Sequence, residues 1–203
     1  MPRLRPPCLT VLLAALLVLA AAVGPAHAAV NKKKTVSAGA YASALCSHLA
    51  SWAADLQQGS DDLSARLQGA QNIRAGKRLL VTFLQNTTKR TDRLVREVDA
   101  VGVPKVANGL KIAQALHSGL VKASGVFRTA LAGAKKLSTS SETKFSQGAT
   151  EISAAISSGS SSVAEALGSV STLYPSPELT AALAQQPECV SLSGTPDTTT
   201  TQP

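Results

Sequence analysis

The chain has 203 residues, a formal net charge of +8 at pH 7, and a hydrophobic content of 44% that includes few aromatic side chains. Sheet cores favour branched and aromatic residues, so an alanine-rich, aromatic-poor chain argues against a β fold and for closely packed helices. Its length suits a single domain.

The first 28 residues have the layout of a secretory signal peptide. Arg3 and Arg5 precede an apolar run at 9–23, and the small residues Ala26 and Ala28 fit a cleavage site. The apolar run is about 15 residues long, shorter than the roughly 20 that a membrane-spanning helix needs. The sequence therefore predicts a secreted protein whose mature chain begins at residue 29 and has no transmembrane segment.

Residues 29–39 contain three lysines at 32–34 and little that could pack against a core, so we expect a flexible basic arm. Cleavage removes Arg3 and Arg5, which leaves 18 basic against 12 acidic residues and a net charge of +6. The mature protein is therefore still strongly basic.

The first helix is expected over residues 40–68, where apolar side chains recur every three or four positions along one face. This stripe consists of Tyr41, Leu45, Leu49, Trp52, Leu56, Leu63 and Leu67. Gly59 interrupts the stripe, and because glycine costs about 1 kcal/mol relative to alanine inside a helix, we expect a kink there.

The second helix, residues 73–101, has the most regular stripe, and we expect the other helices to pack around it. Its stripe positions are Ile73, Lys77, Leu80, Leu84, Thr87, Thr91, Leu94, Val98 and Val101. Gly102 and Pro104 are stop signals that end it. A long basic helix with a single apolar stripe is unstable alone in water, so it needs helical partners.

Two further helices are expected over residues 106–137 and 142–173. The first carries a broad apolar face that includes Phe127. The hinge at 138–142 consists of serine and threonine followed by glutamate, a composition that caps a helix start. The serine-rich stretch at 157–162 could act as a linker, but the heptad spacing continues across it, which favours an unbroken helix.

Pro175 and Pro177 break the fourth helix, and a short helix is expected over residues 178–185 with Ser176 as its cap. Residues 191–203 are mostly serine, threonine, proline and glutamine without periodicity. That composition predicts a disordered tail.

Short connections between long helices favour antiparallel neighbours, so residues 40–190 predict an all-α, up-down-up-down four-helix bundle. This topology returns the chain after the fourth helix to the start of the first, which places Cys189 near Cys46. An even pair of cysteines in an exported chain indicates a disulfide. A Cys46–Cys189 bridge is therefore expected to staple the short C-terminal helix to the bundle.

No motif in the sequence names a reaction. The chain has no G-x-S-x-G, C-x-x-C, H-x-x-x-H or H-E-x-x-H pattern, so neither catalytic residues nor a metal site are predicted. Some secreted all-α enzymes bury arginine and lysine inside a bundle, but here Lys77 alone lies on a stripe. An all-α secreted enzyme is therefore the second alternative function.

Basic side chains concentrate on the predicted second and third helices. The candidate site for binding an anionic surface consists of Arg74, Arg78, Lys89, Arg90, Arg93 and Arg96. An exported protein with few stacking aromatics suits nucleic acid poorly, so the expected partners are anionic envelope polymers or lipid headgroups. The alternative is a solvated face that only keeps the protein soluble.

Folding the predicted helices antiparallel places a layer of small and polar side chains midway along the bundle. The candidate ligand-pocket residues in this layer are His48, Trp52, Thr87, Thr91 and His117. Two histidines facing each other across a bundle can ligate haem, so a carrier of haem or a small hydrophobic ligand is the first alternative function. The other interpretation is that His117 bonds to Thr87 or Thr91 in the core and His48 faces solvent. No other cofactor is expected.

The signal peptide, the richness in alanine, valine and arginine, and the cysteine-bracketed helical domain resemble small secreted helical proteins of high-GC Gram-positive bacteria. The resemblance covers the whole mature domain but rests on layout and composition. It implies an extracytoplasmic role and transfers no site residue. We therefore expect a secreted, non-enzymatic binding or cell-envelope interaction module.

Overall fold

The computed structural model describes residues 34–192, so the predicted signal peptide, residues 29–33 of the predicted arm and the tail from residue 193 lie outside the described residues. The described part is mostly helical. Its elements, in chain order, are β1 (Thr35–Val36), α1 (Ala38–Gln68), α2 (Ile73–Val101), β2 (Val103–Pro104), α3 (Gly109–Lys136), α4 (Glu142–Leu173), α5 (Pro177–Ala184) and α6 (Pro187–Leu192).

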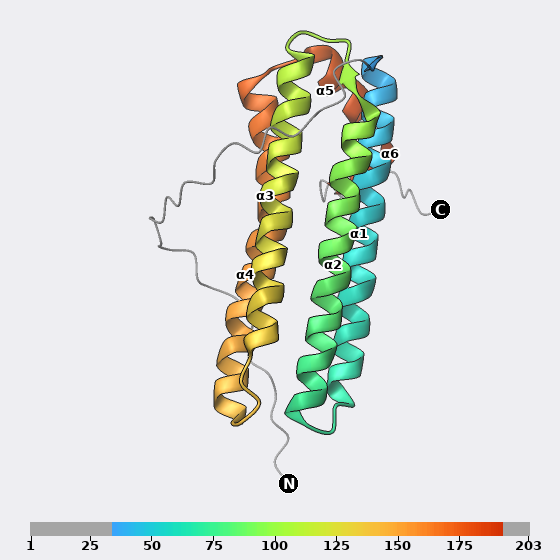
Figure 1. The fold of residues 1–203 in the computed structure, drawn as a ribbon. Helices are drawn as coiled ribbons and strands as arrows, with labels where there is room; N and C mark the ends of the chain where they lie inside the picture. Colours follow the sequence, from blue (N-terminus) through green and yellow to red (C-terminus); the bar gives the residue numbers. More distant parts are fainter. Residues whose placement is uncertain (1–33, 193–203) are drawn as a thin grey trace, which may run out of the picture.

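The four long helices lie side by side along one axis (Figure 1). α1 packs on α2, α2 on α3, and α3 on α4, while α5 and α6 return to pack on α1. Among the described residues, no helix is both long and apolar enough to cross a bilayer. Helix α2 thus packs between α1 and α3, so its charged side chains are exposed only on the sides that these two helices do not cover.

The bounds of α2 agree with the sequence prediction because both of its ends carry strong signals. Asn72 accepts a hydrogen bond at Oδ1 from the amide of Ala75 at 2.9 Å, and Gly102 follows the helix with a positive φ of 98°. The stripe from Leu80 to Val101 is buried, whereas Ile73 and Lys77 are half-buried.

Lys77 has a structural reason to lie on the stripe. Its Nζ donates to the carbonyl oxygen of Leu137 at 2.9 Å. Leu137 is the C-cap of α3, where carbonyl groups have no partner within the helix and favour a cation. Lys77 therefore fastens the end of α3 to the start of α2.

The predicted flexible arm is wrong at its C-terminal end, because residues 34–39 are ordered. Strand β1 pairs with β2 in parallel, with Thr35 opposite Val103, and α1 begins at Ala38 with Ser37 as its N-cap. Lys34 Nζ also donates to the carbonyl of Ala100 at 2.9 Å. Strands of two residues are too short to show an alternation of apolar and polar residues, so the sequence did not predict the pairing of β1 with β2.

Glycine makes the close approach of β1 and β2 feasible. A Cβ on Gly102 would overlap the carbonyl oxygen of Lys34, and the φ of 98° disfavours other residues. Helix α3 starts at Gly109, three residues later than predicted, because Asn108 adopts a left-handed conformation with φ of 59°.

Helices α1 and α4 both continue through glycines expected to weaken them. At Gly59 a Cβ would stand 3.3 Å from the Phe83 ring, so the glycine makes room for α2. At Gly159 a Cβ would stand 3.1 Å from the ring of Phe127 on α3. Helix α1 is unbroken at Gly59, where a kink was predicted, and α4 is continuous as its heptad spacing indicates.

The C-terminal end of the predicted domain also needs correction. Helix α6 includes residues 191 and 192, which the sequence assigned to a disordered tail. Cys189 in α6 and Cys46 in α1 lie at disulfide distance, with their Cα atoms 5.1 Å apart. This proximity agrees with the predicted Cys46–Cys189 pair, although the helix that it holds against α1 is α6, which follows the short helix predicted over residues 178–185.

Two apolar clusters fill the space between the helices. The first contains Tyr41, Leu45, Leu49, Leu94, Val98, Ile112, Leu116 and Val170, and the second contains Leu80, Leu84, Ala130, Ala134, Leu137 and Ile152. Between them, α2 contributes the buried residues Thr87, Thr88 and Thr91. Thr88 and Thr91 each donate to a carbonyl one turn earlier, at 2.8 and 2.9 Å, so both hydroxyl groups are satisfied without a ligand.

Candidate functional site

The two histidines among the described residues pair with carboxylates on different sides of α2. His117 Nδ1 on α3 lies 2.6 Å from Asp99 Oδ1. His48 Nδ1 on α1 lies 3.5 Å from Glu97 Oε2. Residues 97 and 99 are separated by a rotation of about 200° around a helix of 3.6 residues per turn, so they point in nearly opposite directions. The two imidazoles therefore lie on separate sides of α2.

The candidate pocket residues are thus divided between two places. Trp52 donates from Nε1 to Thr91 Oγ1 at 3.1 Å. Thr91 in turn donates to the carbonyl of Thr87. The expected bond between His117 and one of these threonines is wrong, because α3 presents His117 to Asp99 instead.

His117 and Tyr41 carry buried polar atoms that have no hydrogen-bond partner within the described part of the chain. His117 is 6% exposed with Nε2 unbonded, and Tyr41 is 1% exposed with its hydroxyl unbonded. Burial, and to a smaller extent the Asp99 carboxylate, raises the pKa of Tyr41 above its ordinary value. Both side chains therefore lie in the packed interior.

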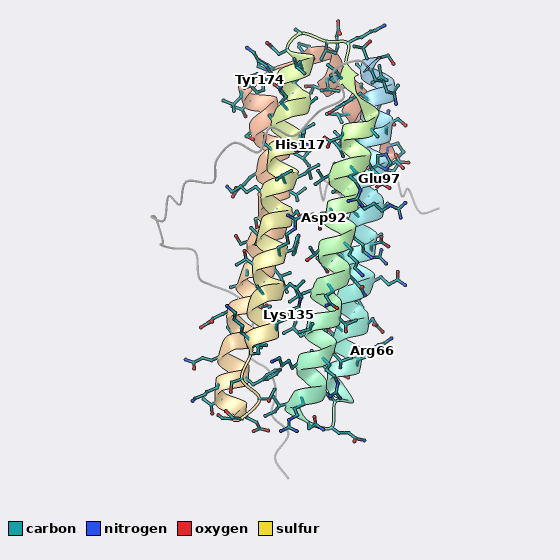
Figure 2. The ribbon with its side chains drawn as sticks, in the orientation of Figure 1. Arg66, Asp92, Glu97, His117, Lys135 and Tyr174 are labelled. Atoms are coloured by element: carbon teal, nitrogen blue, oxygen red, sulfur yellow. A yellow bond between two sulfur atoms is a disulfide. The ribbon has the colours of Figure 1, made fainter. Side chains whose placement is uncertain are left out.

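A second carboxylate of α2 makes a similar contact with α3. Asp92 Oδ1 accepts from the buried hydroxyl of Ser124 and, at 2.7 Å, from Arg128 Nη2. Figure 2 shows Asp92 and His117 along the facing sides of α2 and α3, with Glu97 turned toward α1. Asp92 and Asp99 were not predicted, although both flank the buried stripe of α2.

Charged pairs also join α2 to α1. Arg90 pairs with Asp55, and Glu97 accepts from Arg93 Nε at 2.7 Å as well as contacting His48. Two of the six predicted anion-binding residues therefore already have acidic partners. Both guanidinium groups are nevertheless exposed, because these pairs lie at the surface.

The other four predicted cations form what we call the basic face of α2: Arg74, Arg78, Lys89 and Arg96. All four are exposed, and within residues 34–192 none has an acidic side chain in ion-pair distance. Their spacing of 4, 11 and 7 positions places them on one side of the helix, opposite the buried stripe. The basic face spans about 33 Å along the axis at 1.5 Å per residue.

Two grooves run between α1 and α2 beside the basic face. The first encloses about 550 Å³ and is lined by Ser47, His48, Ser51, Trp52, Asp55, Lys89, Arg90, Arg93, Leu94 and Glu97. The second encloses about 400 Å³ around Gly59 and Phe83, and it shares Asp55 and Arg90 with the first. The Asp55–Arg90 pair thus stands where the two grooves meet. Ser47 and Ser51 were not predicted as site residues. Together with Asp55 they recur every four residues, which places all three on one side of α1 and could have indicated a shared surface.

One apolar cavity lies between the helices, and it is much smaller than the grooves. An apolar cavity beneath α5, lined by residues that include Leu45, Leu116 and Leu179, encloses about 50 Å³. Pockets for small organic ligands usually have volumes of about 300 to 1,000 Å³. This cavity is far smaller than haem or a comparable hydrophobic ligand requires.

The described residues contain no cluster of three or more histidine, cysteine, aspartate or glutamate side chains that could hold a metal ion. No protein-family model matches the chain, and no curated protein or solved structure matches it either.

Proposed function

We propose that this protein is a secreted, non-enzymatic binding module of the cell envelope, built as an up-down-up-down four-helix bundle. The basic face of α2 binds an anionic envelope polymer. The observation that carries this proposal is the row of Arg74, Arg78, Lys89 and Arg96, which is exposed along one side of a rigid helix without acidic partners in the described part.

The acidic residues of α2 have their partners away from the basic face. Its carboxylates Asp92 and Asp99 meet partners on α3, and Glu97 meets His48 on α1 and Arg93 on α2 itself. They are therefore not available to neutralise the basic face. A row of cations with low-dielectric protein behind it attracts anions more strongly than scattered charges do.

The shape of the row favours a linear polymer over a lipid surface. The exposed large apolar residues of the described chain are Leu67, Leu110, Val121, Leu173, Val190 and Leu192, and α2 contributes none of them. A helix that inserts into a headgroup layer needs apolar side chains beside its charges. The basic face lacks them, so it suits a polyanion that lies along it.

Secretion is proposed on two grounds. The first 28 residues read as a cleaved signal peptide. In addition, Cys46 and Cys189 lie at disulfide distance, and disulfides persist mainly in oxidising, extracytoplasmic settings.

The test is binding of the mature protein, beginning at residue 29, to a soluble anionic polymer such as polyphosphate, followed by isothermal titration calorimetry across a salt series. We expect affinity to fall steeply with salt, because exposed charges are screened beyond about 8 Å at physiological ionic strength. Vesicles with and without phosphatidylglycerol form the comparison arm. Absence of polymer binding at low salt, or affinity that salt does not change, would overturn the proposal.

A further inference from the structure

The larger groove between α1 and α2 has two chemically different walls. On α1, Ser47, Ser51 and Asp55 follow one another at intervals of four residues, so they lie along one edge. On α2, Lys89 and Arg93 are also four residues apart and form the opposite edge. One wall therefore offers hydroxyl groups and the other offers cations.

An aromatic ring lies between these walls. Trp52 is half-buried, and its Nε1 donates inward to the fully buried Thr91. That bond directs the polar edge of the indole toward the core and fixes the ring, while the side chain still lines the groove. The rigid apolar surface of an indole packs well against the C–H face of a sugar ring.

Charged pairs stand at both ends of the groove. His48 and Glu97 lie at one end, and Asp55 and Arg90 lie at the other. The distance between residues 48 and 55 along α1 is about 10 Å. Counting side chains that line the groove, Lys89, Arg90 and Arg93 outweigh Asp55 and Glu97, so the net charge is positive even with His48 neutral.

Hydroxyl donors, a fixed aromatic ring and an excess of cations within about 10 Å match one chemical class. We infer that this groove binds an acidic sugar, meaning one or two sugar units that carry a carboxylate or a phosphate. The ring packs on Trp52 and its hydroxyl groups bond to Ser47 and Ser51. The acidic group meets Lys89, the groove cation without an acidic partner in the described part, with the exposed Arg93 beside it. This inference rests on the proposed function and deepens it, since it assigns acidic sugars to the envelope polymer, for which polyphosphate is a probe of the basic face alone.

Trp52 is the single tryptophan of the chain, so its fluorescence reports directly on the groove. The wild-type protein is titrated with a glucuronate disaccharide, with glucose 6-phosphate and with the neutral disaccharide maltose, and calorimetry is run in parallel. We expect the acidic sugars to change the Trp52 emission and maltose to bind at least about tenfold more weakly, because a charge-assisted contact is lost. The two acidic ligands distinguish a carboxylate source from a phosphate source.

Two exposed substitutions test the walls. Lys89→Gln and Ser51→Ala are each expected to weaken acidic-sugar binding, Lys89→Gln by about tenfold or more. Lys122→Gln on α3 is the matched control, since Lys122 is exposed and outside the groove. Equal affinity of maltose and the acidic sugars, or equal weakening by Lys122→Gln, would overturn the inference.

The same samples separate this inference from the proposed function. The double variant Arg74→Glu and Arg78→Glu changes the basic face outside the groove. We expect it to lose polymer binding and keep the Trp52 response to acidic sugars. Polymer binding by a protein whose Trp52 emission ignores acidic sugars would sink the groove assignment alone. A Trp52 response without any polymer binding would sink the proposed function alone.

Discussion

His117 on α3 donates from Nδ1 to the Asp99 carboxylate on α2 across 2.6 Å. Seven residues earlier on α2, Asp92 accepts from Ser124, which lies seven residues later on α3. Equal steps in opposite directions are what an antiparallel pair of helices requires. The two carboxylates therefore pair α2 with α3 in one antiparallel register.

The first prediction compares the two histidine contacts. His117→Leu is expected to destabilise the protein by about 1 to 3 kcal/mol, because it leaves the half-buried Asp99 without its partner. His48→Leu breaks a contact that is about one-third exposed on each side, and such pairs contribute at most about 1 kcal/mol. Chemical denaturation measures both variants. Equal losses for the two variants would contradict this account of the register.

The second prediction concerns Tyr41. Its hydroxyl is buried without a partner in the described part, so Tyr41→Phe is expected to leave stability at pH 7 unchanged or slightly raised.

At alkaline pH the same variant should gain on the wild type. The folded-state pKa of Tyr41 is raised, so above about pH 10 the unfolded chain loses this proton while the folded chain retains it. Wild-type stability then falls with rising pH, relative to Tyr41→Phe, by up to about 1.4 kcal/mol per pH unit. Urea denaturation from pH 7 to 11 measures the difference, and parallel curves for the two proteins would refute it.

The second helix shows what its residues could predict. Asn72 and Gly102 mark its ends, and regular spacing places Leu80, Leu84 and Leu94 on the buried side. The exposed positions of the basic face follow from the same spacing. These features depend on local sequence, so periodicity and the glycine stop signal were sufficient, although the capping role of Asn72 was not predicted.

Other contacts depend on how each helix is rotated and on its register against its neighbour. The spacing placed His117 near Thr87 and Thr91, but in the observed register it meets Asp99, which lies eight residues beyond Thr91 and so about 12 Å further along α2. Likewise, nothing local indicates that Ser51 lies across a groove from Lys89. A residue beside the apolar stripe of a helix can face either neighbouring helix or solvent. The sequence of that helix alone does not show which of these it faces.

The third prediction addresses the glycine beside β1. Gly102→Ala is expected to destabilise the protein by more than about 1 kcal/mol, because it combines positive φ with overlap against the Lys34 carbonyl. Gly125→Ala, in the middle of α3, is the matched control. A Cβ at Gly125 would meet no neighbouring atom within 4 Å, and alanine stabilises a helix by about 1 kcal/mol relative to glycine. Thermal unfolding should therefore shift in opposite directions for the two variants. A shared direction would contradict the described path of β1.

The fourth prediction concerns Cys46 and Cys189, which are 143 positions apart. The chain-entropy model gives a bridge of this span about 5 kcal/mol of stabilisation, with measured values commonly lower. Reduction should lower the free energy of unfolding. The double variant Cys46→Ala and Cys189→Ala should lose the same amount, apart from the small change in packing. A thiol assay on the unfolded, unreduced protein should find no free thiol from this pair. Two reactive thiols would exclude the bridge.

The central claim is that the basic face of α2 binds an anionic polymer. The most direct measurement compares two fourfold charge reversals to glutamate by calorimetry with polyphosphate at low salt. One variant replaces Arg74, Arg78, Lys89 and Arg96, and the other replaces the exposed lysines Lys122, Lys135, Lys136 and Lys144 of α3 and α4. Both change the net charge equally, and circular dichroism checks that both remain helical. We predict that the first variant loses binding and the second retains most of it, whereas equal loss in both would show attraction to overall charge and contradict a site on α2.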